Sequence, residues 1–174
     1  PYHGDHIGEA LREHGGRSAF EIKLDGARIQ MHKKGQEVRV FSRHLSEVTE
    51  GLPDVVSMVR DGVRADAAIL EGEAVAVGKN GRPMVFQDLM RRFGRIHDVH
   101  KAMREIPLQI HLFDILYLDE KALLNIPYEG RREMLEGLCD PGLLVKRLVT
   151  ADPTEAKRFL ESAMRAGHEG LMAK

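Results

Sequence analysis

The sequence predicts an α+β fold in which mostly antiparallel sheets are flanked by helices. Short segments alternate apolar and polar residues, as strands with one buried face do. Two of these segments, residues 19–32 and 37–42, follow each other closely enough to form a hairpin. Amphipathic segments with helix start and stop signals lie between other strands. Because the 174 residues contain no repeat and no long Pro/Gly linker, we expect a single domain over residues 1–174.

The alternation in residues 19–32 changes phase once. Apolar residues stand at even positions up to Leu24 and at odd positions from Ala27 onward. A continuous strand cannot exchange its two faces without a bulge or a turn. The break is therefore expected at Asp25 and Gly26, since Asp-Gly favours turns.

The other elements follow from the same patterns. Strands are expected at residues 37–42 after a turn at 33–35, and at 67–77, 108–118, 143–149 and 170–174. Helices are expected at residues 7–13 within an opening segment of residues 1–17, and at 53–60, 83–93, 98–105 and 128–138. A last helix is expected to begin at Pro153, after the capping residue Asp152, and to end at Gly167.

Composition narrows the class of protein. With 43 % apolar and 30 % charged residues the chain resembles a globular domain. No apolar run approaches the roughly 20 residues of a membrane span, so no membrane association is expected. A net charge of −1 argues against this segment binding DNA by itself, because many DNA-binding domains are strongly basic. The single cysteine, Cys139, excludes an internal disulfide and fits a reducing cytosol.

A lysine and an arginine flank the predicted turn in the segment KLDGAR. Lys23 could attack phosphorus only as a neutral amine, which requires a nearby cation or metal, or removal of its proton during the reaction. Arg28 is a candidate cation, and Gly26 lets the backbone turn tightly around a ligand. The alternative for this segment alone is a surface hairpin with a salt-bridged lysine.

Two carboxylates share one face of the apolar strand at residues 67–77. Glu71 and Glu73 are two positions apart, so their side chains point the same way. Like charges this close in apolar surroundings are costly unless a cation or ligand hydrogen bonds offset them. A metal ion or ribose hydroxyls would serve, and a pair of exposed carboxylates is the alternative.

The strand at residues 108–118 carries an aromatic and an acidic residue in an apolar run. Phe113 is expected on one side with His111 and Ile115, where its ring could stack on a purine or simply belong to the core. Asp114 needs a partner such as a backbone amide or an arginine.

The last strand carries Glu169 and Lys174. These two side chains could hold a metal ion and a phosphate, or form a structural salt bridge.

Taken together, five segments resemble, in order and spacing, successive motifs of the covalent nucleotidyltransferases. The segments are KLDGAR, SRH, LEGEAVAV, LFDILYLD and EGLMAK. That superfamily comprises ATP-dependent DNA ligases, RNA ligases and mRNA capping enzymes. The intervening GKNGRPMVFQDLMRRFGR looks closest to archaeal-type DNA ligases. The resemblance covers residues 18–174 and implies the nucleotidyltransferase (ATP-grasp-like) fold of an adenylation domain.

The resemblance also implies roles for individual residues. Lys23 would form the covalent bond to AMP, and Glu21 would read the adenine edge. Arg28 would hold the ribose, and Arg43 the ribose or an incoming nick phosphate. Phe113 would stack on adenine.

Three further residues would handle the phosphates and the metal. Glu73 would bind a ribose hydroxyl or a metal ion, and Glu169 would help to place a divalent metal. Lys174 would contact the α-phosphate. The implied cofactors are ATP, with AMP as the covalent adduct, and Mg²⁺, which prefers carboxylate oxygens and phosphates.

The implied partner is nicked double-stranded DNA in the prokaryotic cytosol, with a sliding clamp as a further partner. The family also has another lysine motif, an oligonucleotide-binding (OB) barrel and an N-terminal DNA-binding domain, so we expect part of a larger ligase that does not seal nicks alone. The alternatives are an RNA ligase or guanylyl-transferring capping enzyme, and a noncatalytic nucleic-acid-binding relative.

Overall fold

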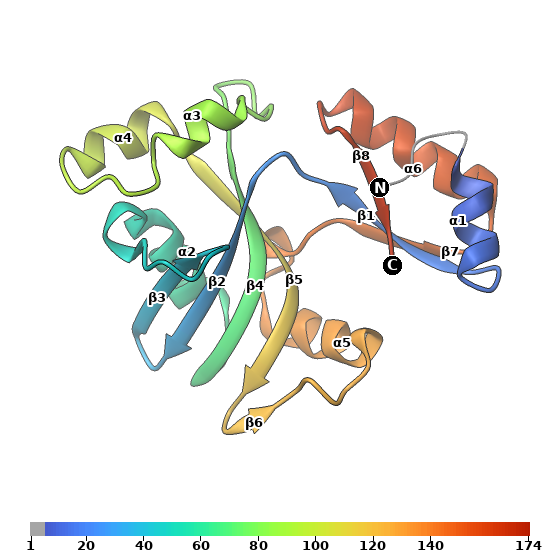
Figure 1. Cartoon of the computed structure of the whole chain (residues 1–174), viewed down its shortest axis with the longest axis horizontal. Helices are drawn as coiled ribbons and strands as arrows, with labels where there is room; N and C mark the ends of the chain where they lie inside the picture. Colours follow the sequence, from blue (N-terminus) through green and yellow to red (C-terminus); the bar gives the residue numbers. More distant parts are fainter. Residues whose placement is uncertain (1–5) are drawn as a thin grey trace. The chain divides into compact units, whose positions relative to one another are not determined.

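The computed structural model describes residues 6–174 and divides into two compact units (Figure 1). The first unit comprises the chain up to Asp25 and from Val145 onward, and the second comprises Gly26–Leu144. Residues 1–5 of the expected opening segment lie outside the described residues. Both units mix helices with antiparallel sheets, which confirms the predicted fold class.

The first unit is a three-stranded antiparallel sheet with two helices. Its strands are β1 (Ser18–Lys23), β7 (Arg147–Thr150) and β8 (Gly170–Ala173), in the order β7-β1-β8. Helices α1 (Ile7–Glu13) and α6 (Pro153–Arg165) bury their apolar residues against one face of this sheet. On that face Phe20 and Ile22 of β1 pack with Leu160 of α6.

Helix α6 begins and ends at the predicted signals. The Asp152 carboxylate accepts a hydrogen bond from the Thr154 amide at 2.9 Å, and Pro153 is the first helical residue. Gly167 takes the left-handed conformation, with φ 93°, just beyond the helix. The start and the end of α6 are therefore fixed by local chemistry.

The second unit is a five-stranded antiparallel sheet in the order β3-β2-β4-β5-β6. The strands are β2 (Ala27–Lys34), β3 (Glu37–Ser42), β4 (Ala67–Ala76), β5 (Leu108–Leu118) and β6 (Lys121–Ala122). The helices are η2 (Thr49–Gly51), α2 (Pro53–Gly62), α3 (Phe86–Met90), α4 (Val99–Glu105), α5 (Tyr128–Leu138) and η3 (Pro141–Leu143). Val59 of α2 and Leu135 of α5 join the core on one face of the sheet, with Met31 and Leu70. The other face carries the polar residues of β2 and β4.

The predicted break at Asp25 and Gly26 is confirmed, because β1 ends at Lys23 and β2 begins at Ala27. Gly26 is required there by a close approach of two backbones. A Cβ atom at this position would lie 2.4 Å from the carbonyl oxygen of Ala74 in β4.

Strand β5 contains a bulge that the sequence pattern did not predict. In the β4–β5 ladder Glu71 pairs with Asp114 and Gly72 pairs with Leu112, so Phe113 is the additional residue. A Cβ atom on Gly72 would lie 2.6 Å from the His111 carbonyl oxygen, so only glycine allows β5 to come this close.

The bulge corrects the expected arrangement of side chains in β5. Ile115 was expected on the same side as Phe113, yet it is fully buried in the core while Phe113 is not. The extra residue reverses the alternation as far as the second register shift of this ladder, at Leu116, and this places Ile115 on the core side.

Three expected element boundaries were wrong. The helix expected at 83–93 is only Phe86–Met90, because Pro83 bridges back to Val77 and keeps the chain extended. The strand expected at 143–149 starts at Arg147, because Pro141–Leu143 forms a 3-10 turn. Strand β2 runs to Lys34, which moves the turn to Gly35, with φ 59°.

Among residues 6–174, no helix combines the length and apolarity needed to cross a membrane.

Candidate functional site

Lys23 is the last residue of β1 and stands opposite Gly170 in the antiparallel ladder with β8. This register brings its ammonium nitrogen to 3.3 Å from Oε2 of Glu169, the residue just before β8. Only 28 % of the Lys23 side chain is exposed, against 53 % of the Glu169 side chain. The lysine is therefore partly shielded from solvent and paired with a carboxylate that water and ligands can reach.

Glu21 and Lys174 form a second ion pair in the same unit. The Glu21 side chain is 4 % exposed, and its Oε2 lies 2.5 Å from Lys174 Nζ. Because strand residues alternate, Glu21 and Lys23 share the sheet face opposite the buried Phe20 and Ile22. The first unit thus gathers two lysines and two glutamates, all of them predicted site residues.

In the second unit, the polar face of the sheet gathers further predicted residues. Arg28 stands opposite Glu73 in the β2–β4 ladder and forms a hydrogen-bonded ion pair with Glu71, two residues along β4. The Arg28 guanidinium also lies 5.4 Å from the centre of the Phe113 ring, within range of a cation–π contact. Phe113 follows the buried Leu112 in β5, so strand alternation places it on this face.

A cavity of about 350 Å³ opens on the same face. Both predicted arginines line it, together with one carboxylate and four other residues: Arg28, Ile29, Gln30, Ser42, Arg43, Leu45 and Glu71. Two guanidinium groups around one cavity suit a ligand with negatively charged oxygens. Leu45 is 64 % exposed with φ 63°, so the loop after Arg43 is held in a conformation that L-residues rarely adopt.

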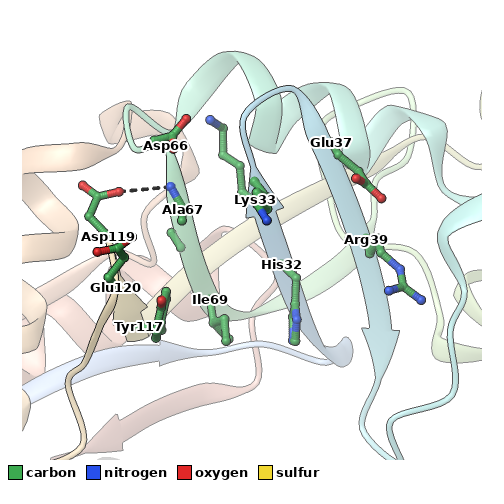
Figure 2. A pocket seen from close by; sticks show the side chains of 12 residues that line it. His32, Lys33, Glu37, Arg39, Asp66, Ala67, Ile69, Tyr117, Asp119 and Glu120 are labelled. Atoms are coloured by element: carbon green, nitrogen blue, oxygen red, sulfur yellow. Dashed lines mark hydrogen bonds between the residues drawn. The ribbon is translucent and has the colours of Figure 1, made fainter.

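A larger cavity of about 690 Å³ lies toward the other end of these strands (Figure 2). In Figure 2, His32, Ile69 and Tyr117 line it from three neighbouring strands, and the Asp119 carboxylate accepts a hydrogen bond from the Ala67 amide. None of the predicted site residues lines this cavity.

Asp114 has both of the partners considered for it. Its carboxylate accepts hydrogen bonds from Arg131 Nε at 2.8 Å and Nη2 at 3.2 Å, and from the Ile115 amide at 2.8 Å. The bond to Asp114 raises the pKa of Arg131. Asp114 therefore joins β5 to α5.

The carboxylates predicted to bind a metal ion are present, but within residues 6–174 they are not gathered into a preformed metal site. Among residues 6–174, no group of three or more His, Cys, Asp and Glu side chains could hold a metal ion. Glu73 belongs to the second unit and Glu169 to the first. Mg²⁺ is commonly held by one or two carboxylates with substrate phosphates and water, so either glutamate has the right donor chemistry.

Two residues of this face were not singled out from the sequence. Gln30 and His32 continue the alternation that begins at Arg28, and this spacing predicts all three on one face but gives Gln30 and His32 no site role. Their hydrogen bonds to each other, and that of Gln30 to Glu71, appear only in the structure.

Comparison with known proteins gives one consistent result. The model of the family "ATP dependent DNA ligase domain" matches residues 3–174. DNA ligase 1 of Korarchaeum cryptofilum is 52 % identical over 171 residues, which are 98 % of this chain and 31 % of that ligase. The DNA ligase of Thermococcus onnurineus is 45 % identical over 171 residues, 97 % of this chain and 30 % of that ligase.

Solved structures agree with the sequence comparison. A mycobacterial DNA ligase D complexed with ATP and MES superimposes with a TM-score of 0.65 at 28 % identity, over 91 % of this chain and 48 % of that one. The bacteriophage T7 ATP-dependent DNA ligase in complex with ATP shares the fold, with a TM-score of 0.53 at 20 % identity, over 99 % of this chain and 60 % of that one.

The fold is thus the nucleotidyltransferase fold of ligase adenylation domains. This chain belongs to the ATP-dependent DNA ligase domain family. It spans about 31 % of the length of the first archaeal ligases that it matches.

Proposed function

We propose that this chain is the adenylation part of an ATP-dependent DNA ligase and that Lys23 takes AMP from ATP. The observation that carries the proposal is the position of Lys23 at the end of β1, partly shielded and 3.3 Å from Glu169, in a chain that matches the ligase family over residues 3–174. We also propose that both compact units belong to one adenylation domain.

The reaction is a nucleotidyl transfer. The neutral amine of Lys23 attacks the α-phosphorus of ATP, a nitrogen–phosphorus bond forms, and the bond from the α-phosphorus to the bridging oxygen breaks. Pyrophosphate leaves with the electron pair of that bond, and the amine loses a proton. Such transfers depend mainly on positioning and on neutralising phosphate charge.

The remaining residues position the nucleotide in this proposal. Glu21 reads the adenine edge, and Phe113 stacks on the ring. Arg28 holds the ribose, and Arg43 contacts the ribose or the nick phosphate. The cavity lined by both arginines supports these two assignments.

Charge on the phosphates is handled by three further groups. Lys174 contacts the α-phosphate. Glu73 and Glu169 are the carboxylates proposed to hold Mg²⁺, with Glu73 also able to bind a ribose hydroxyl. When bound, Mg²⁺ would neutralise phosphate charge.

The rest of the ligase reaction follows from the same proposal. AMP passes from Lys23 to the 5′-phosphate of a nick in double-stranded DNA, and the 3′-hydroxyl then displaces AMP and seals the strand. We propose that an OB barrel, a DNA-binding domain and a sliding clamp take part in nick sealing, and that ligation takes place in the prokaryotic cytosol.

The test is mass spectrometry of the chain after incubation with ATP and Mg²⁺. An added AMP is expected on the parent chain and on a Lys157→Ala control, whose lysine is exposed on α6, but not on Lys23→Ala. A chain that gains no AMP, or a Lys23→Ala variant that still gains it, contradicts the proposal. A parallel incubation with GTP distinguishes ATP use from the guanylyl transfer of capping enzymes.

A further inference from the structure

A chain of hydrogen bonds runs along the polar face of the second unit, from β2 to β4 and back. His32 Nε2 lies 2.7 Å from Gln30 Oε1, and Gln30 Nε2 donates to Glu71 Oε1 at 3.3 Å. The other oxygen of Glu71 accepts from Arg28, whose guanidinium lies over Phe113. The chain therefore ends at two residues proposed to hold the nucleotide.

The chemistry of the groups fixes the direction of this chain. The carboxylate of Glu71 can only accept, so Gln30 must turn its amide nitrogen toward it. The amide oxygen of Gln30 then faces His32, and this oxygen also only accepts. His32 must therefore carry a proton on Nε2, and each group orients the next.

The first member of the chain is itself held in place. The His32 ring lies 4.8 Å from the Phe41 ring, centre to centre, at an interplanar angle of 53°. His32 also lines the larger cavity (Figure 2). Burial, and to a lesser extent the charge of Arg39, lower the pKa of His32, which favours the neutral ring. A neutral imidazole carries one N–H, and the hydrogen bond to Gln30 Oε1 assigns it to Nε2.

Arg28 is more exposed to solvent than the carboxylate that it contacts. Half of its side chain is exposed (51 %), whereas only 15 % of the Glu71 side chain is. A long exposed side chain samples several rotamers, and ordering it on ligand binding costs free energy. Because Gln30 already holds the Glu71 carboxylate, part of the cost of ordering Arg28 is met before the nucleotide binds.

We propose that His32 and Gln30 are positioning residues, which fix Glu71 and through it hold Arg28 against Phe113 before the nucleotide binds. The inference rests on the proposed function, because Arg28 must contact the nucleotide for its position to matter. Gln30 lines the same cavity as Arg28 and Arg43, but in this scheme its role is to hold Glu71 and not to bind the nucleotide.

The first test is ATP affinity, measured by calorimetry in a Lys23→Ala background so that no reaction occurs. Gln30→Leu removes the donor to Glu71 and is expected to weaken ATP binding about tenfold, as the loss of one charge-assisted hydrogen bond would. The control is Gln36→Leu, an exposed residue in the β2–β3 turn, which should leave the affinity unchanged. Equal urea midpoints for all variants show that the fold is retained.

A double-mutant cycle separates positioning from a purely structural role. If Gln30 acts through Arg28, then Gln30→Leu has no further effect on ATP affinity once Arg28→Ala is present. If the two effects multiply instead, Gln30 does not act through Arg28 and the inference is overturned.

A third measurement does not depend on nucleotide binding. Nitrogen-15 NMR of the imidazole should show His32 as the Nε2–H tautomer at neutral pH, and Gln30→Leu should shift the Nε2 resonance because the acceptor of its hydrogen bond is lost. A parent His32 with its proton on Nδ1 overturns the inference even if ATP binds. If the Lys23→Ala parent does not bind ATP, that result counts against the proposed function. The tautomer of His32 still tests the chain of hydrogen bonds in that case.

Discussion

The Lys23 ammonium nitrogen and Glu169 Oε2 lie 3.3 Å apart, joined by the register of β1 and β8 rather than by closeness in sequence. The pair is partly open to solvent, so its contribution to folding stability is small. Its two members are the proposed nucleophile and a proposed metal ligand. We therefore propose that chemistry at this position, more than stability, explains the pair.

Replacement of the carboxylate tests this explanation. Glu169→Gln is expected to leave the unfolding free energy nearly unchanged, because 53 % of the side chain is exposed. It should raise the Mg²⁺ concentration for half-maximal adenylation by about tenfold, since an amide is a weaker ligand than a carboxylate. The measurement is a Mg²⁺ titration of AMP incorporation, with Glu161→Gln on the exposed surface of α6 as the control. An unchanged Mg²⁺ requirement would exclude Glu169 as a ligand.

The bulge in β5 depends on Gly72. A Cβ atom there would lie 2.6 Å from the His111 carbonyl oxygen, so Gly72→Ala must push β5 away. We expect a loss of about 1–3 kcal/mol in unfolding free energy, as for other overpacked positions. ATP affinity should also fall, because Phe113 moves with the bulge.

The control for this prediction is Gly137→Ala in α5. A Cβ atom at Gly137 meets nothing within 4 Å, and alanine is the better helix former, so stability should rise by about 0.5–1 kcal/mol. Urea unfolding measures both variants. Equal effects of the two substitutions would show that the close approach at Gly72 does not matter.

Arg92 is fully buried and its charge is balanced by Asp54. Two hydrogen bonds join them, from Nη2 to Oδ1 at 2.7 Å and from Nη1 to Oδ2 at 3.0 Å. Asp54→Ala leaves a buried cation without its counter-charge, so we expect a loss of about 3–5 kcal/mol. Glu105→Ala, which breaks only an exposed pair with Lys101, should cost less than about 1 kcal/mol. A mild effect of Asp54→Ala in thermal and urea unfolding would contradict this account.

Cys139 makes stability depend on alkaline pH. Burial raises the pKa of its thiol from 9.0 to about 11, so the folded chain keeps a proton that the unfolded chain releases. Stability therefore falls between pH 9 and 11, by up to about 1.4 kcal/mol per pH unit from this group. Cys139→Ala should lack this component in unfolding curves measured across that range. If parent and variant lose stability in parallel, the thiol is not responsible.

Several features could be predicted from the sequence because they depend on local chemistry. The phase change at Asp25 and Gly26 located the break between β1 and β2, and the residues Asp152, Pro153 and Gly167 located α6. The family could also be inferred from the order of five short motifs, which the comparisons confirm. Backbone turns and helix caps are satisfied within a few residues, so short patterns suffice.

The pairing of side chains was decided by the tertiary structure alone. Glu169 and Lys174 were considered as a pair with each other, but the antiparallel register gives each a partner on β1, Lys23 and Glu21 respectively. The bulge at Phe113 likewise depends on how closely β4 lets β5 approach. Strand register and close packing join residues that are far apart in sequence, and a local pattern carries no record of which distant backbone will lie beside it.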